Sequence, residues 1–309
     1  MINNNTIMQI IETKINGFDN VIKHKKTPLP RSRNPHLPPL YFTMLSVASK
    51  NSGKTYSIVN LISLFEKSGN SVYDHKGNKL PIRTIWCSPT SNSSANSVLD
   101  ELKSLDPEDR HEDVDEELLK DIYEQIKTEK VEIEERSRYI EAYKRYVKVN
   151  PMKLTDEEIM ILSMYDFEHP RDLPKLKYDH PPVIFLVLDD MISSNAIFGS
   201  KRSNFISNLT IKHRHYGINL IFTTQSLKAI PNVIRKNIDL LQLFKNSNKT
   251  YVLDQLQEEV SGILSKDKFE AFYDYVIDKP FGNLCLNMHP DVKKEYRIRN
   301  GWDTYLTIK

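Results

Sequence analysis

The stretch SVASKNSGKTYSIVNLI, residues 46–62, decides the fold of this chain. It contains Gly53, Lys54 and Thr55, which match the end of a phosphate-binding loop. Glycine lets the backbone approach a phosphate, lysine supplies positive charge, and the hydroxyl can bind Mg²⁺. The apolar run 40–47 before the loop predicts a buried strand, and apolar residues at helical spacing follow the loop. A helix that begins here would direct its positive dipole end at the phosphates.

Position 48 departs from the loop pattern, which has a glycine where this chain has Ala48. Alanine has the smallest side chain after glycine and serves equally well wherever φ is negative. The substitution therefore weakens the match to the pattern without abolishing the chemistry. We expect the loop to bind the phosphates of a nucleotide. Its expected binding residues are Ala48, Ser49, Lys50, Asn51, Ser52, Gly53, Lys54, Thr55 and Tyr56.

Composition limits the classes of protein that this chain can be. It has 309 residues, 39% of them hydrophobic, so it can bury the core of one large or two modest domains. The net charge of +2 means that nucleic-acid contacts must come from local clusters. Cys87 and Cys285 lie far apart, which fits a reducing compartment better than a disulfide framework. We expect no signal peptide and, without an apolar run of about 20 residues, no membrane span.

Further apolar and β-branched runs predict an α/β fold. The expected strands are 40–47, 82–90, 181–190, 218–224 and 239–245, with two more near the C-terminus. The expected helices follow the loop, span about 202–215 and 231–237, and occur twice more after residue 250. Strands that alternate with helices form a mostly parallel sheet covered by helices.

Four regions are expected along the chain. Residues 1–39 are predicted to be an extended N-terminal arm, and residues 40–309 an α/β core that contains the phosphate-binding loop. Prolines and basic residues alternate at the end of the arm, so it is either a solvated linker or a contact to a neighbouring subunit or phosphate backbone. The basic residues concerned are Lys25, Lys26, Arg31 and Arg33.

Two regions of the expected core differ from the rest. Residues from about 92 to 180 are dense in charge and read as a helical insertion. The insertion is either a solvated helical hairpin or a lever that contacts DNA, capsid or a neighbouring subunit. Residues from about 250 to 309 are expected to form a C-terminal region of helices and strands.

A second motif, VIFLVLDD, ends the predicted strand 181–190 with Asp189 and Asp190. In P-loop proteins that hydrolyse nucleotides, an acid at this position binds Mg²⁺, and the next acid can orient or deprotonate the attacking water. Gln225 ends the predicted strand 218–224. If that strand lies between the two motif strands, the amide of Gln225 projects toward the γ-phosphate. The alternative is that these polar residues only open loops.

Two arginines are candidates for stabilising the transition state. Arg214 lies between His213 and His215, just before the strand 218–224, and Arg235 lies just after that strand. An arginine finger is often supplied by a neighbouring subunit. Arg214 is the first candidate and Arg235 the second, and the alternative for each is an ordinary surface residue.

The combination of motifs resembles the FtsK/HerA-type pumping ATPases. This resemblance implies that residues 40–309 form a P-loop ATPase core of the RecA-like (ASCE) class. Within the FtsK/HerA group the combination is most similar to the poxvirus-type genome-packaging ATPases of large double-stranded DNA viruses and virophages. The segments that carry the resemblance are ASKNSGKT, VIFLVLDD, RHYGINLIFTTQS and IRKNIDLLQLFK. Together they cover about residues 40–90 and 180–250.

The resemblance implies a role for each site residue. Lys54 and Thr55 would bind ATP and its Mg²⁺, with Asp189 as the other metal ligand. Asp190 would activate water and Gln225 would sense the γ-phosphate. Arg214 would act across the subunit interface. Two positions depart from the wider group, because Ala48 replaces a glycine and Asp190 stands where many members have a glutamate.

The resemblance also implies partners. The chain would form a homo-oligomeric ring, a pentamer or hexamer, that threads double-stranded DNA into a preformed viral capsid. Its partner would be the capsid or the portal vertex. It would act in the host cytoplasm or a viral factory, or be part of the virion. Contacts to DNA would be to phosphates and independent of sequence. Lys201 and Arg202 are the candidate DNA contacts, with an ordinary solvated loop as the alternative.

Other functions stay open at this level. A kinase acting on a small molecule would need an arginine-rich lid, and the sequence has none. An assembly protein that binds nucleotide with little hydrolysis would fit the degenerate loop at Ala48, but it has no need for Asp189, Asp190 and Gln225 together. Another DNA-pumping ATPase of the same type remains an alternative to genome packaging.

Overall fold

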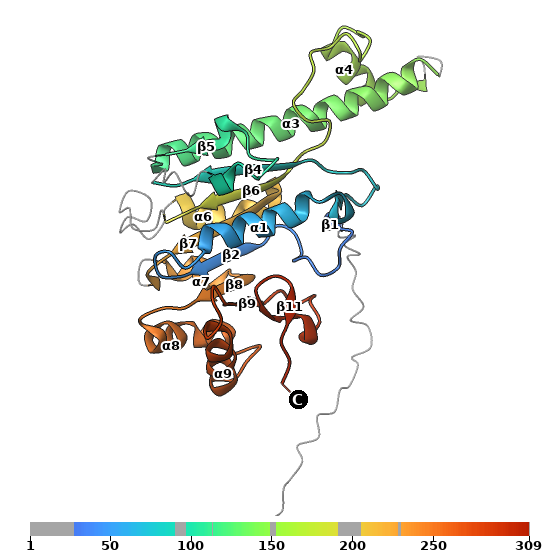
Figure 1. Ribbon diagram of the computed structural model, residues 1–309. Coiled ribbons are helices and arrows are strands. Elements are labelled where there is room, and N and C mark those ends of the chain that lie inside the picture. The colour runs from blue at the N-terminus through green and yellow to red at the C-terminus, as the bar shows by residue number, and fades with distance from the viewer. Residues whose placement is uncertain are drawn as a thin grey trace, which may run out of the picture.

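The computed structural model describes residues 28–89, 97–112, 114–148, 153–190, 205–227 and 230–308. Within these ranges nine strands form one sheet, in the order β11-β10-β9-β8-β2-β7-β6-β4-β5 (Figure 1). The parallel strands are β8 (Leu240–Phe244), β2 (Thr43–Val47), β7 (Ile218–Thr224), β6 (Val183–Leu188), β4 (Ile82–Cys87) and β5 (Arg110–His111). The antiparallel strands are β9 (Asn283–Asn287), β10 (Ile298–Asn300) and β11 (Thr304–Tyr305). The predicted mostly parallel α/β sheet is confirmed.

The strand order brings the motif strands together. β7 lies between β2, which leads into the loop, and β6, which leads into the paired aspartates. Val47 at the end of β2 pairs with Thr224, and Leu188 at the end of β6 pairs with Phe222. The three strands therefore end at the same edge of the sheet, which we call the carboxyl edge.

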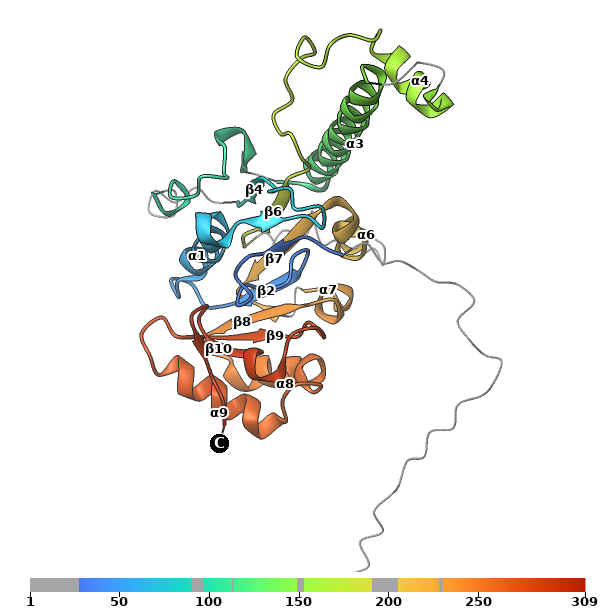
Figure 2. The same ribbon diagram turned by 90° about the vertical axis from the view of Figure 1, so that its right-hand side faces the viewer.

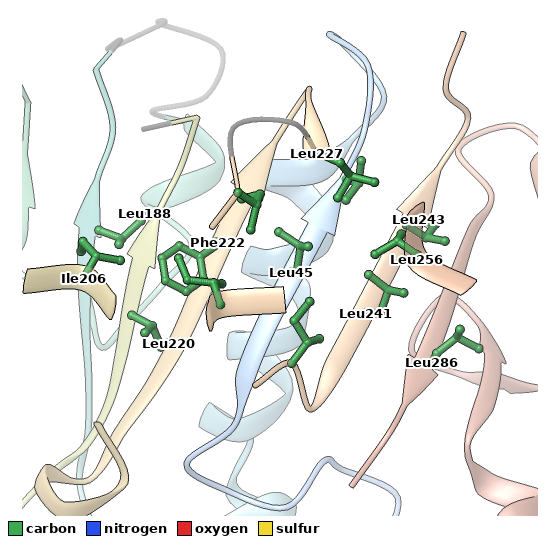
Figure 3. Packing of buried hydrophobic residues seen from close by; sticks show 14 of the residues in the cluster. Leu45, Leu188, Ile206, Leu220, Phe222, Leu227, Leu241, Leu243, Leu256 and Leu286 are labelled. Atoms are coloured by element: carbon green, nitrogen blue, oxygen red, sulfur yellow. The ribbon is translucent and has the colours of Figure 1, made fainter. Parts of the chain in front are cut away.

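Helices cover both faces of the sheet (Figure 2). α1 (Lys54–Glu66) lies on one face. The hydrophobic cluster on the other face includes residues of α6 (Phe205–Lys212), α7 (Asn232–Lys236), α8 (Lys249–Val260) and α9 (Lys266–Ile277). Side chains alternate along β2, so Met44 packs with the α1 cluster while Leu45 and Val47 pack with the opposite one. Figure 3 shows Leu45 within that opposite cluster. Burial of the strands on both faces explains their continuous apolar sequences.

The described part of the predicted arm, residues 28–39, packs against the core. β1 (Arg31–Ser32) pairs with β3 (Val72–Tyr73), and the guanidinium of Arg33 lies 4.5 Å from the centre of the Tyr73 ring. Arg33 is thus engaged within its own chain. Lys25 and Lys26 lie outside the described residues.

The region predicted to be a helical insertion, about 92–180, has two parts. The first part belongs to the core, because the short helix η2 (Pro107–Asp109) leads into edge strand β5, and Leu99, Leu102 and Leu105 are buried in the α1 cluster. The second part is a helical hairpin of α3 (Glu116–Tyr146) and α4 (Asp156–Met164). The first part was not expected, since its strand has two residues and carries no periodic signal.

α3 serves both the core and the hairpin. Its first half buries Leu119, Ile122 and Ile126 in the cluster that contains α6 to α9. Its second half extends past the sheet and carries α4 at its far end (Figure 1). There Tyr139 and Leu162 belong to a separate small cluster.

One buried arginine joins this helix to the sheet. Arg83 of β4 donates to both carboxylate oxygens of Asp109, at 2.9 and 2.7 Å, and to Glu129 of α3 at 2.6 Å. The side chains of Arg83 and Asp109 are each 3% exposed. Such a pair is costly to break, because either partner left alone would be a buried charge.

The remaining short elements are η1 (Ser68–Asn70), η5 (His213–Tyr216) and η7 (Lys294–Tyr296). Cys87 and Cys285 are buried free thiols. In the ranges that the structure describes, no helix has the length and apolar character needed to cross a bilayer.

Candidate active site

The loop after β2 has the backbone geometry that its sequence requires. Ala48 is fully buried, and its N–H donates to the carbonyl oxygen of Thr224 at 3.0 Å. Left-handed backbone occurs at Asn51 (φ 60°) and Gly53 (φ 93°), not at Ala48. Gly53 therefore needs to be glycine, whereas position 48 accepts a side chain.

Lys54, Asp190 and Gln225 meet at the carboxyl edge. Lys54 is the first residue of α1 and is 7% exposed, and its Nζ donates to Oδ1 of Asp190 at 2.7 Å. Nε2 of Gln225 donates to Oδ2 of the same carboxylate at 3.2 Å. Three residues from separate parts of the sequence thus converge on one charged cluster.

Asp189 lies beside this cluster and is held by two hydroxyl groups. Thr55 Oγ1 donates to its Oδ2 at 3.3 Å, and Thr223 Oγ1 donates to its Oδ1 at 2.6 Å. Thr223 also accepts a hydrogen bond of 2.8 Å from the backbone N–H of Asp190. Our sequence reasoning missed Thr223, although it lies two positions before Gln225 and so faces the same side of its strand.

The electrostatics of Asp189 favour a bound cation. Burial raises the pKa of Asp189, and the negative charge of Asp190 raises it further. The hydrogen bond from Thr223 and the positive charge of Lys54 lower the pKa, but the net shift is upward. The Thr55 hydroxyl and the Asp189 carboxylate are hard oxygen donors of the kind that Mg²⁺ prefers. Mg²⁺ is commonly bound by one or two such side chains together with phosphate oxygens of a substrate. The residues present therefore fit this ion.

The other predicted loop residues surround the same point. Ser52 Oγ donates to the carbonyl oxygen of Ser49 at 2.8 Å, which closes the loop on itself. Lys50 and Tyr56 are exposed, Tyr56 on the first turn of α1.

The structure does not bring Arg214 to the other site residues. Arg214 lies in η5, before β7, and so at the opposite edge of the parallel sheet. Its Nη2 donates to both carboxylate oxygens of Asp239, at 2.8 and 2.7 Å. Asp239 precedes β8 and also accepts from the backbone N–H of Thr43 at 2.9 Å. Within one chain Arg214 is therefore a partner of Asp239.

Arg235 also lies apart from the cluster. Arg235, near the end of α7, contacts Asn232 and Gln255. Lys201 and Arg202, the predicted DNA contacts, lie outside the described residues.

Comparison with known protein families identifies the chain. The family model described as zonular occludens toxin (Zot) matches residues 49–263, which is more than half of the chain and includes the span from Lys54 to Gln225. The chain belongs to the Zot family. This membership confirms the resemblance to FtsK/HerA-type P-loop ATPases, and the chain is an ATPase.

Several solved structures are similar to this Zot-family ATPase. One is B204, the DNA-packaging ATPase from Sulfolobus turreted icosahedral virus, at 15% identity and a TM-score of 0.40, covering 80% of this chain and 92% of that one. Another is the genome-packaging NTPase B204 from Sulfolobus turreted icosahedral virus 2 in complex with ATP-γS. It is 14% identical with a TM-score of 0.40, and the match covers 84% of this chain and 96% of that one. The third is the N-terminal domain of zonular occludens toxin from Neisseria meningitidis. It is 12% identical with a TM-score of 0.29, and the match covers 68% of this chain and 80% of that one. No curated protein matches the chain significantly.

The geometry at position 48 makes a prediction for the Zot-family ATPase. Ala48→Gly should change ATP turnover by no more than about twofold, because the backbone there is not left-handed. It should lower the free energy of unfolding by about 1 kcal/mol, because a buried methyl group is lost and glycine gives the unfolded chain more conformational freedom. Steady-state phosphate release and thermal melting test the two parts. A large change in turnover would contradict this description of the loop.

Proposed function

We propose that this protein hydrolyses Mg²⁺-bound ATP to drive double-stranded DNA translocation, and that it packages a viral genome. The observation that carries the proposal is the convergence of Lys54, Asp189, Asp190 and Gln225 on one point at the carboxyl edge. The coupling to DNA rests on the four motifs that resemble the packaging ATPases. Family membership supports the ATPase part.

Binding of ATP would rearrange the Lys54–Asp190 pair. The two side chains form an ion pair of 2.7 Å, with Asp190 34% exposed. The phosphates of ATP carry more negative charge than one carboxylate and compete with it for Lys54. Asp190 would then be released to accept a hydrogen bond from the attacking water, while Gln225, its present neighbour, orients that water. The pair thus makes activation of water depend on the presence of ATP.

Thr55 and Asp189 would hold the Mg²⁺ that accompanies ATP. This ion neutralises charge that develops on the phosphates. Thr223 fixes the orientation of Asp189 by donating to the oxygen that Thr55 does not contact. Because Thr223 also accepts from the N–H of Asp190, one hydroxyl positions both acids.

Asp189→Asn should stabilise the protein without ligand and remove its ATPase activity. The raised pKa of Asp189 means that the ionised carboxylate is less favourable in the folded chain than in the unfolded one. The neutral amide avoids this cost and can still accept from Thr223. We expect the melting temperature to rise at pH 8, by about 2–4 °C for each 1 kcal/mol gained in the free energy of unfolding.

The pH dependence of that gain follows from the sign of the pKa shift. The cost of the ionised Asp189 falls as the pH drops below the raised pKa, and it vanishes only below the ordinary pKa of an aspartate, about 4. The gain from asparagine should therefore shrink as the pH falls from 8 to about 4. Thermal melting at both pH values measures this, with the exposed Asp121→Asn as the matched control. A variant that melts below the native protein at pH 8 would contradict the assignment of Asp189 as an unfavourable buried charge.

The function is tested by ATP turnover with and without linear duplex DNA. We expect DNA to stimulate turnover, and added salt to weaken the stimulation because phosphate contacts are electrostatic. Turnover that DNA does not change would contradict translocation. Nucleotide binding with no turnover under either condition would contradict hydrolysis and favour the assembly protein.

The arrangement of subunits has its own test. We propose that subunits form a ring in which Arg214 acts on the ATP of its neighbour after exchanging Asp239 for phosphate. Arg214→Ala and Lys54→Ala subunits, each inactive alone, should then recover activity when mixed, because some interfaces combine an intact loop with an intact arginine. The readout is phosphate release across a series of mixing ratios. No recovery at any ratio would contradict the action of Arg214 in trans.

A further inference from the structure

Phe281 is held in an unusual state. It lies between α9 and β9, and with 76% of its surface accessible it is the most exposed large hydrophobic residue that the structure describes. Its φ of 55° is left-handed, a conformation that is unfavourable for a residue with a bulky side chain. A single exposed phenyl group is ordinary. An exposed one on strained backbone suggests a function.

The position of Phe281 suggests what that function is. β9 runs antiparallel to β8, and Asn283 at its start pairs with Phe244 at the end of β8. The turn before β9 therefore lies at the carboxyl edge, beside the phosphate-binding loop. The phenyl ring is so near Gly53 that a Cβ built there would lie 3.5 Å from Cδ1 of Phe281.

The turn is rigid. A Cβ at Gly282 would lie 2.0 Å from the backbone carbonyl oxygen of Val276, so any side chain at this position would clash with the backbone of α9. Asn283 Nδ2 donates to the carbonyl oxygen of Phe281 at 3.2 Å. Both features fix the backbone that carries the ring.

The same turn is connected to the helix that follows the phosphate loop. Asn283 Oδ1 accepts from Gln242 Nε2 at 2.9 Å, and the same Nε2 donates to Ser57 Oγ on α1 at 2.6 Å. Gln242 is fully buried, and its side-chain oxygen Oε1 accepts from Ser46 Oγ of β2 at 3.0 Å. This buried network keeps the Phe281 turn in register with the strand and the helix that flank the loop.

We propose that Phe281 stacks on the base of the nucleotide whose phosphates the loop holds. The inference rests on the proposed function, since it takes ATP as the ligand. Phosphates held at Gly53 and Lys54 leave the nucleoside to extend over the rim of the loop, where the phenyl ring offers an apolar face. Stacking requires no hydrogen bond to the base and is tolerant of its identity. Phe281 therefore provides affinity for purine nucleotides, and GTP should bind nearly as well as ATP.

The test compares a ligand that has a base with one that lacks it. Binding of Mg²⁺-ATP and of Mg²⁺-tripolyphosphate is measured by calorimetry for the native protein, Phe281→Ala and Phe281→Trp. We expect Phe281→Ala to weaken ATP binding about tenfold or more and to leave tripolyphosphate binding within about twofold. Phe281→Trp should restore ATP binding, because the ring face is kept.

Phe167→Ala is the matched control. Phe167 is also exposed and left-handed, with a φ of 56°, but it follows α4 at the end of the helical hairpin. It should not change the binding of either ligand. An equal loss of ATP and tripolyphosphate binding in Phe281→Ala would mean that the variant only distorts the loop, and unchanged ATP binding would mean that the ring does not touch the base. Either result overturns the proposal.

This experiment is independent of turnover. If the native protein binds ATP but fails to hydrolyse it with or without DNA, the proposed function fails while the base contact can still be confirmed. If turnover is normal and Phe281→Ala binds ATP as the native protein does, the base contact fails alone.

Discussion

Lys54→Ala should reduce ATP turnover by about a thousandfold or more, the upper range for loss of one charge-stabilising donor. Lys54 is the buried cation that α1 presents beside Asp189 and Asp190. Without it, the phosphates of ATP would meet two carboxylates with no lysine between them. The loss is therefore expected in catalysis and also in ATP affinity.

The measurement is phosphate release at saturating Mg²⁺-ATP, with circular dichroism to establish that the variant is folded. Lys67→Ala is the matched control, because Lys67 is an exposed lysine at the opposite end of the same helix. It should retain native turnover. A folded Lys54→Ala protein with turnover within about tenfold of native would contradict the role of this lysine, since such a loss equals only about 1.4 kcal/mol.

Arg83→Met should have the largest effect on stability, a loss of about 3–5 kcal/mol in the free energy of unfolding. The substitution leaves Asp109 as a buried carboxylate without its cation and removes the contact from β4 to Glu129 of α3. Methionine fills most of the volume, so the loss reports mainly the unpaired charge. The melting temperature should fall by about 10 °C, given 2–4 °C for each 1 kcal/mol.

Two further variants sharpen this test. Arg145→Met removes the cation of the Arg145–Glu158 pair, in which the arginine is 52% exposed, and should cost no more than about 1 kcal/mol. Arg83→Met combined with Asp109→Leu should recover part of the lost stability, because it removes the orphaned charge. A double variant less stable than Arg83→Met alone would contradict that explanation. Chemical denaturation gives the three free energies.

Most of the central fold could be predicted from the sequence, because the strands β2, β6, β7 and β8 are buried on both faces and read as continuous apolar runs. The short strand β5 could not, since two residues of an edge strand have no periodicity and are placed by pairing with β4. The first half of α3 was read as an insertion for a related reason. Its charged surface dominates its composition, while a few buried residues attach it to the sheet.

The residues that meet at the carboxyl edge could be predicted for a physical reason. In a parallel sheet the strands end at one edge, so the polar residues that follow apolar runs meet there once the strand order is right. Asp190 and Gln225 come just after the apolar runs of β6 and β7, and Lys54 ends the loop that follows the run of β2. Thr223 was missed because it lies inside its strand, where a threonine is an ordinary residue.

By itself, the sequence determined the phosphate-binding loop, the buried strands and the acids and amide that follow them, because strand burial and loop chemistry are local properties. Tertiary structure alone decided the partners. It paired Arg214 with Asp239 at the far edge, buried Arg83 between β4 and α3, and placed Phe281 beside Gly53. These contacts join residues 25 to more than 200 positions apart, so they follow from how the sheet and helices pack and from no pattern along the chain.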